Sequence, residues 1–142
     1  MKIPNWLKTY GDTSYRGGCA LEDAELMTFF NELNRLHPHL ASVAIHPDNE
    51  GLVLGTGHHH HIKQKAKGAI KKGAADIIIV GNPTFVCELK RRDHTKCRWQ
   101  DGQLEFLRTS QEIGAFVCVA LGYEAALNAV DYWIKIKNLR DI

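Results

Sequence analysis

Two apolar runs separated by three turn residues constrain the fold of this chain more than any other feature. Residues 75–80 (ADIIIV) and 84–90 (TFVCELK) flank Gly81-Asn82-Pro83. Runs of this length that are rich in β-branched residues favour strands, and a Gly-Asn-Pro connection is typical of a turn. The sequence therefore predicts a β-hairpin whose first strand opens on an acid and whose second strand ends on charged residues.

Hydrophobic spacing predicts the elements around this hairpin. Leu26, Phe29 and Leu33 recur at helical intervals, and Pro38 ends that helix. The expected helices span about 20–37, 62–72, 100–113 and 123–136, and the expected strands span 40–46, 75–80, 84–90 and 116–121. The predicted fold is α/β, a mixed sheet flanked by helices in the order α-β-(α)-β-β-α-β-α.

The length of 142 residues and the 44% hydrophobic content predict one globular domain at 19–142. Residues 1–18, with scattered Pro and Gly, are expected to form an irregular N-terminal arm. No run approaches the ~20 apolar residues of a membrane span, and the first residues lack the apolar core of a secretory signal. The expected compartment is the cytoplasm of a cell or of a phage-infected host. Cys87 and Cys118 lie in apolar runs and are expected to be buried free thiols.

Positive charge is concentrated in one part of a chain whose net charge is only +2. Ten of the 18 Lys and Arg residues fall between 63 and 98, namely Lys63, Lys65, Lys67, Lys71, Lys72, Lys90, Arg91, Arg92, Lys96 and Arg98. A basic tract on a nearly neutral protein indicates a polyanionic partner on one face. The alternative is a solvated, lysine-rich surface.

Glu88 and Lys90 are the most unusual residues of the hairpin. They are two positions apart in a strand and therefore share a face, while Phe85, Cys87 and Leu89 make the other face apolar. Burying such charges without partners would cost several kcal/mol. A hard divalent cation such as Mg²⁺ or Mn²⁺, held by Glu88 together with Asp76, would supply the compensation. The alternative is a salt bridge across the hairpin.

The first predicted helix adds a third acid. Glu22 lies four, seven and eleven residues before three apolar residues of the stripe, so it falls within the stripe. The alternative is an acid placed at a helix start by the helix dipole. Glu25 lies at the flank of the same stripe.

Clustered acids and an amine suit phosphodiester hydrolysis. The reaction needs an activated water and neutralisation of the phosphate charge, which metal ions held by carboxylates provide, and a lysine steadies the developing charge. Four basic residues follow directly and are candidates to hold the phosphate backbone of a nucleic acid: Arg91, Arg92, Lys96 and Arg98. The sequence has no Gly-rich phosphate loop and no Ser/His/Asp arrangement, which argues against nucleotide hydrolysis and acyl transfer.

The pattern Asp76…Glu88-Leu89-Lys90 resembles the PD-(D/E)XK nuclease motif, with Ala75 where the motif has Pro. The wider series resembles the VRR-NUC (virus-type replication-repair nuclease) domain. Its pieces appear in order: Glu22, the loop His46-Pro47-Asp48-Asn49-Glu50-Gly51, the approach Lys72-Gly73-Ala74-Ala75-Asp76, the core Glu88-Leu89-Lys90, and Gln103 followed by Gly114.

This resemblance implies a restriction-endonuclease-like fold and a Mg²⁺ or Mn²⁺ ion bound by Asp76, Glu88 and the backbone carbonyl of Leu89. It implies that Glu22 completes the metal site, with Glu25 as the alternative, and that Lys90 is the catalytic lysine. Gln103 would support the site or touch the substrate; a surface or capping role is its alternative. Small stand-alone members of the family resemble homodimeric resolvases of branched DNA such as Holliday junctions.

The expected function is therefore a Mg²⁺-dependent DNA endonuclease with no nucleotide cofactor. The expected DNA-binding residues are Lys67, Lys71, Lys72, Arg91, Arg92, Lys96 and Arg98. The rival hypotheses are a monomeric nicking or flap nuclease, a DNA-binding module without catalysis, and a zinc-binding regulator that uses the four histidines at 58–61. Trp99 is expected to pack in the core.

Overall fold

The computed structural model describes residues 1–47 and 72–140. Several sequence-based expectations lie outside these residues: most of the basic helix predicted at 62–72, the histidines at 58–61, and the loop residues Asp48, Asn49, Glu50 and Gly51. The same holds for two of the expected DNA-binding residues, Lys67 and Lys71.

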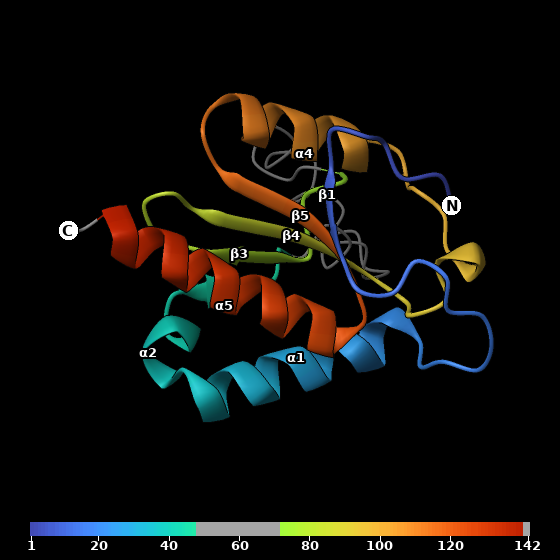
Figure 1. Cartoon of the computed structure of the whole chain (residues 1–142), viewed down its shortest axis with the longest axis horizontal. Coiled ribbons are helices and arrows are strands. Elements are labelled where there is room, and N and C mark those ends of the chain that lie inside the picture. Colours follow the sequence, from blue (N-terminus) through green and yellow to red (C-terminus); the bar gives the residue numbers. More distant parts are fainter. Residues whose placement is uncertain (48–71, 141–142) are drawn as a thin grey trace, which may run out of the picture.

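A five-stranded mixed sheet in the order β1-β5-β4-β3-β2 forms the centre of the molecule (Figure 1). β5 pairs in parallel with β1 and β4, whereas β3 pairs antiparallel with β4 and β2. The strands are β1 (Lys8–Tyr10), β2 (Ala44–Ile45), β3 (Ile77–Ile79), β4 (Phe85–Lys90) and β5 (Phe116–Leu121). The helices are α1 (Glu22–Leu36), α2 (Pro38–Ala41), the 3₁₀ helix η1 (His94–Lys96), α4 (Gln103–Glu112) and α5 (Tyr123–Arg140).

Helices cover both faces of the sheet, with α1 and α5 on one side and α4 on the other (Figure 1). Strand alternation divides the core accordingly. Phe85, Cys87 and Leu89 of β4 pack in the cluster that contains Phe29 of α1, whereas Val86 packs with Leu107 of α4. By the same alternation, Glu88 and Lys90 lie on the α4 side. None of the helices in the described ranges has both the length and the hydropathy of a membrane span.

The predicted hairpin is confirmed. β3 and β4 are antiparallel, and Ile77 pairs with Cys87 and Ile79 with Phe85. The expectation of a mixed sheet with helices is confirmed, and so are buried free thiols at Cys87 and Cys118. Those two cysteines face each other across β4 and β5.

Two expectations were wrong. The arm at 1–18 is not irregular throughout, because Lys8–Tyr10 forms edge strand β1 against β5; three residues are too few to leave an alternation signal. The strand predicted at 40–46 begins instead as the short helix α2, with Pro38 at its first turn, where proline's fixed φ is favourable. Only Ala44–Ile45 pairs with β3. Within the described residues, the element order therefore has β1, α2 and η1 added to the predicted one.

Candidate active site

Asp76, which directly precedes β3, and Glu88 of the neighbouring strand β4 lie at the same end of the sheet. The register that pairs Ile77 with Cys87 continues to place Asp76 opposite Glu88, and residues opposite each other in an antiparallel pair project to the same face. Oδ2 of Asp76 accepts a hydrogen bond from the Leu89 backbone N–H at 3.0 Å. The two carboxyl groups therefore share one side and one end of the sheet.

Glu88 is a buried carboxyl group that is only half satisfied. Its side chain is 1% exposed. Its Oε1 accepts a hydrogen bond from Nε2 of Gln103 at 2.9 Å, and its Oε2 is buried without a hydrogen-bond partner in the described structure. Burial and the neighbouring charge of Asp76 raise the pKa of Glu88 well above its usual value, and the ammonium of Lys90 opposes that rise.

Lys90 is equally buried, and its ammonium is held from several sides. Nζ donates to the backbone oxygen of Arg98 at 3.0 Å and to Oε1 of Gln103 at 3.1 Å. It lies 3.8 Å from Oε1 of Glu88 and 5.3 Å from the centre of the Trp99 ring. Lys90 therefore forms an ion pair within β4, with Glu88, and not across the hairpin with Asp76 in the described structure, and the shortest contacts of the amine are to neutral oxygens.

Gln103 joins the acid and the amine. Besides its contacts with Glu88 and Lys90, its Oε1 accepts from the Gln100 backbone N–H at 2.8 Å. It is the first residue of α4, and Gly73 fixes that helix start: a Cβ on Gly73 would lie 2.4 Å from the carbonyl carbon of Gly102. The segment that leads to Asp76 therefore packs directly against the residue that holds Glu88.

The two acids of α1 that the sequence offered for the site, Glu22 and Glu25, have separate partners. Oε1 of Glu22 lies 3.8 Å from Nζ of Lys90; burial and the charge of Asp76 raise the pKa of Glu22, against the effect of Lys90. Glu25 is buried on the stripe itself, not at its flank as expected, and its Oε2 accepts from the Tyr123 backbone N–H at 2.6 Å. Glu25 caps the start of α5, a place where a carboxylate is favourable, so Glu22 is the acid that faces the site.

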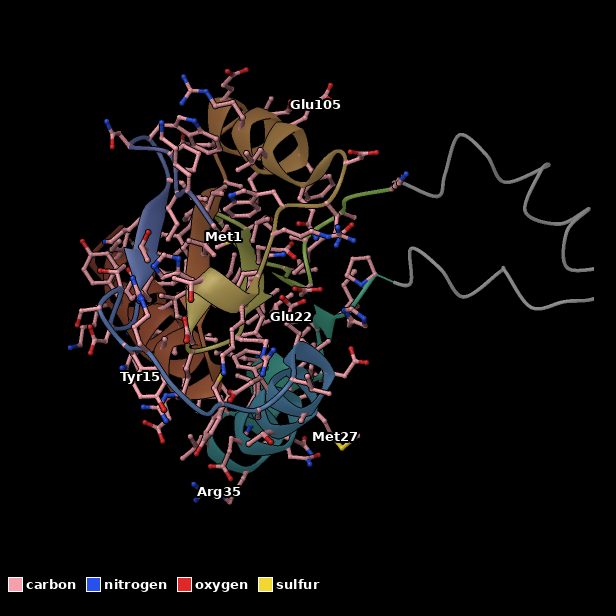
Figure 2. All side chains as sticks on the ribbon, turned by 90° about the vertical axis from the view of Figure 1, so that its right-hand side faces the viewer. Met1, Tyr15, Glu22, Met27, Arg35 and Glu105 are labelled. Atoms are coloured by element: carbon pink, nitrogen blue, oxygen red, sulfur yellow. The ribbon has the colours of Figure 1, made fainter. Side chains whose placement is uncertain are left out.

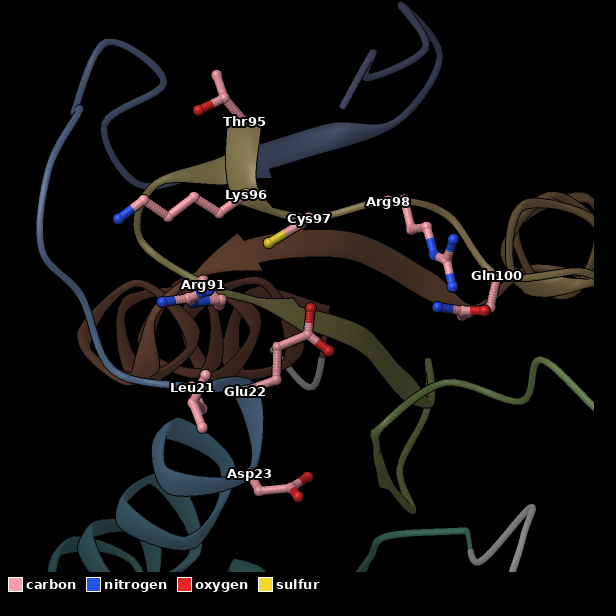
Figure 3. Close-up of a pocket in the computed structure, with 9 residues that line it drawn as sticks. All are labelled: Leu21, Glu22, Asp23, Arg91, Thr95, Lys96, Cys97, Arg98 and Gln100. Carbon is pink, nitrogen blue, oxygen red and sulfur yellow. The ribbon is translucent and has the colours of Figure 1, made fainter.

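Figure 2 looks onto this end of the molecule, with Glu22 in the middle of the face and Glu105 of α4 at its upper border. Beside Glu22 lies a cleft of about 530 Å³, shown in Figure 3. It is lined by Leu21, Glu22, Asp23, Arg91, Thr95, Lys96, Cys97, Arg98 and Gln100.

The described basic residues fall into separate places. Arg91, Lys96 and Arg98 line the cleft of Figure 3. Arg92 lies over the Tyr15 ring and lines a different depression beside Glu25. Exposed Lys72 pairs with Asp101 at 3.6 Å.

No known family model matches the sequence, and no curated protein matches it. Among solved structures, the chain is similar to a VRR_NUC domain protein with a TM-score of 0.60 and 18% sequence identity, over 85% of this chain and 92% of that chain. The chain shares the fold of that protein. At this identity the similarity establishes the fold alone.

Sequence reasoning missed three groups that the fold brings to the site. Nδ1 of His46 lies 2.7 Å from the backbone oxygen of Asp76, and the Arg98 carbonyl holds the amine of Lys90. Cys97 lines the cleft beside Glu22. His46 belongs to the loop on which the family resemblance rests, so the sequence held a signal for this residue. A backbone carbonyl such as that of Arg98 leaves no signal in the sequence. Trp99 packs against the α4-side core as expected, and its Nε1 donates to the Lys2 carbonyl at 2.8 Å.

The donor set is compatible with a hard divalent cation. Oε2 of Glu88 is buried without a hydrogen bond in the described structure, and Asp76 lies beside it on the next strand. Oxygen ligands of this kind are those that Mg²⁺ and Mn²⁺ prefer. Within residues 1–47 and 72–140, no three His, Cys, Asp or Glu side chains already form a metal cage, so a bound ion stays a prediction.

Proposed function

We propose that this protein is a metal-dependent endonuclease that hydrolyses phosphodiester bonds of DNA. The observation that carries the proposal is the pairing of Asp76 and Glu88 at one end of the sheet, with one carboxylate oxygen buried without a hydrogen bond in the described structure and Lys90 enclosed beside it. Acids and an amine clustered together are the groups that this hydrolysis requires. The VRR_NUC fold supports the proposal.

In this proposal, Asp76, Glu88, Glu22 and the backbone carbonyl of Leu89 hold Mg²⁺ or Mn²⁺. A bound ion would supply an activated water for in-line attack on phosphorus and positive charge to neutralise the phosphate, and the expected products carry a 5′-phosphate and a 3′-hydroxyl. Neighbouring residues of the chain hold the two carboxyl groups in position. Gln103 orients one oxygen of Glu88, and Oδ2 of Asp76 is fixed by the Leu89 N–H.

Lys90 is proposed to contact the reacting groups. An ammonium has three N–H donors, and two of them are used by the Arg98 carbonyl and by Gln103. The third remains for a water or a phosphate oxygen. Because the amine is buried, such a contact would be stronger than one in bulk water.

The decisive experiment is cleavage of labelled DNA by Glu88→Gln, with and without Mg²⁺. This substitution keeps the shape of the side chain and removes the charge. We expect cleavage to fall by more than the roughly 10–100-fold that loss of a supporting residue costs, while DNA binding persists. Glu105→Gln, on the exposed surface of α4 (Figure 2), is the matched control and should cleave normally.

Two results would contradict this assignment. Wild-type protein that binds DNA but cuts no duplex, single strand, flap or four-way junction would be a binding module without catalysis. Wild-type cleavage by Glu88→Gln would place the chemistry elsewhere.

The finer part of the proposal, supported by the family resemblance, is that a homodimer cleaves branched DNA such as Holliday junctions. Paired symmetric cuts in a four-way junction need two active sites. Gel filtration should therefore give twice the 16.0 kDa of one chain, and both cuts should appear in one binding event. A monomer that makes single nicks would favour the flap or nicking nuclease instead.

A further inference from the structure

The cleft of Figure 3 borders the proposed active site through Glu22. Glu22 belongs to both places: it lines the cleft, and its Oε1 lies 3.8 Å from Nζ of Lys90. Its side chain points toward the segment that carries Cys97 and Arg98, whereas Asp23 points away from that segment. A ligand in the cleft would therefore lie next to the site.

Three positively charged side chains line this cleft: Arg91, Lys96 and Arg98. Arg91 donates to the carbonyls of Ala20 and Cys19 at 3.1 and 3.0 Å, and Lys96 donates to a carbonyl at 2.8 Å. These acceptors are neutral. None of the ion pairs within the described ranges includes Arg91, Lys96 or Arg98. Their positive charge is therefore not compensated by a direct carboxylate contact there, and the first two side chains are already held in place.

The size of the cleft limits its ligand. A volume of about 530 Å³ lies in the range of small-molecule sites, so a single nucleotide fits within the cleft, whereas a duplex could only lie across its opening. Resting on the proposed function, we propose that the cleft binds one unpaired nucleotide of the cleaved strand through its phosphate, and that Arg98 makes the phosphate contact.

Arg98 is the best placed of the three cations for that contact. Its side chain is exposed and extends into the space beside Gln100 (Figure 3). Its backbone carbonyl, not its side chain, holds the amine of Lys90 at 3.0 Å. A substitution of the side chain therefore removes the phosphate contact and leaves the carbonyl in place.

The test is binding of Arg98→Ala to a labelled single-stranded oligothymidylate and to a blunt duplex of equal length, in Ca²⁺ buffer at several salt concentrations. A charge-assisted hydrogen bond is worth about 1.5–3 kcal/mol, so single-strand affinity should fall about 10-fold or more. The slope of log K against log salt should become shallower by about 0.7, the contribution of one phosphate contact on a single strand. Duplex affinity should change less than about 3-fold.

Arg35→Ala is the matched control, because it removes the same charge about 20 Å along α1 from Glu22. Arg35 pairs with Glu32 and lies at the lower border of Figure 2. It should leave the slope unchanged.

An unchanged slope in Arg98→Ala, equal losses on single strand and duplex, the same loss in Arg35→Ala, or no single-strand binding by the wild type would each overturn the inference. Because binding is measured without cleavage, wild-type protein that binds but never cuts would refute the proposed function and leave the cleft assignment standing.

Discussion

Burial of the Glu88 carboxyl group has an electrostatic cost. An ionised carboxyl group 1% exposed, with one oxygen bonded to Gln103 and the other unbonded in the described structure, is unfavourable unless a positive charge compensates it. Lys90 compensates only in part, since its Nζ is 3.8 Å away. The metal-free protein therefore carries an electrostatic cost at this position that a bound cation would relieve.

This cost predicts a pH dependence of stability. Burial and Asp76 raise the pKa of Glu88, so the folded protein binds this proton more tightly than the unfolded chain. Stability from this group is present below the ordinary Glu pKa and is lost as pH rises above it. In metal-free buffer, the free energy of unfolding of wild type should fall relative to Glu88→Gln between pH 5 and 8, by up to about 1.4 kcal/mol per pH unit.

Urea unfolding of both proteins across that pH range measures the difference. Glu105→Gln serves as the exposed control and should run parallel to wild type. A difference between wild type and Glu88→Gln that stays constant with pH would show that Glu88 titrates normally.

For single residues, the sequence predicted correctly the positions that follow from the regular spacing of side chains along strands and helices. The spacing of Glu88 and Lys90 placed them on one face, and the helical stripe placed Glu22 toward the body. The cap that Glu25 provides to Tyr123 was not predictable, because it joins α1 to α5 across 98 positions. The contacts of Gln103 with both Glu88 and Lys90 likewise depend on how α4 packs on the sheet.

At the scale of elements, the start of α4 is fixed by a close approach of two backbone segments. Gly73 has a φ of +90°, and a Cβ there would meet Gly102 and Gln103 at 2.4–2.8 Å. We expect Gly73→Ala to destabilise the protein by about 2 kcal/mol or more through strain and backbone collision. It should also reduce cleavage, because a displaced α4 would move Gln103 away from Glu88.

Thermal unfolding and cleavage assays test this prediction. Gly18→Ala is the matched control, since no atom lies within 4 Å of a Cβ there. Equal melting temperatures for the two glycine variants would contradict the proposed packing.

Element type was predictable where runs were long and periodic, as for α1, β4, β5 and α5. It was not predictable where an element owes its existence to a neighbour. β1 has three residues and exists through pairing with β5, and the two-residue β2 exists through pairing with β3. Propensity is too weak to define such short strands.

At the scale of the whole molecule, the layered arrangement explains why the site lies where it does. With both sheet faces covered by helices, charged groups meet at the end where β4 and β5 run out and α1 and α4 begin (Figure 1). Glu22, Glu88 and Gln103 come from α1, β4 and α4, and Asp76 directly precedes β3. The sequence supplied their identities through the family resemblance, and the fold brings them together.

The proposed function depends on Asp76 and Glu88 sharing one divalent cation. Calorimetric titration with Mn²⁺ tests it directly. Wild type should bind saturably, Asp76→Asn and Glu88→Gln should each weaken binding more than about 10-fold, and Asp101→Asn, an exposed site, should bind as wild type does. Wild-type affinity in either Asp76→Asn or Glu88→Gln would contradict the claim.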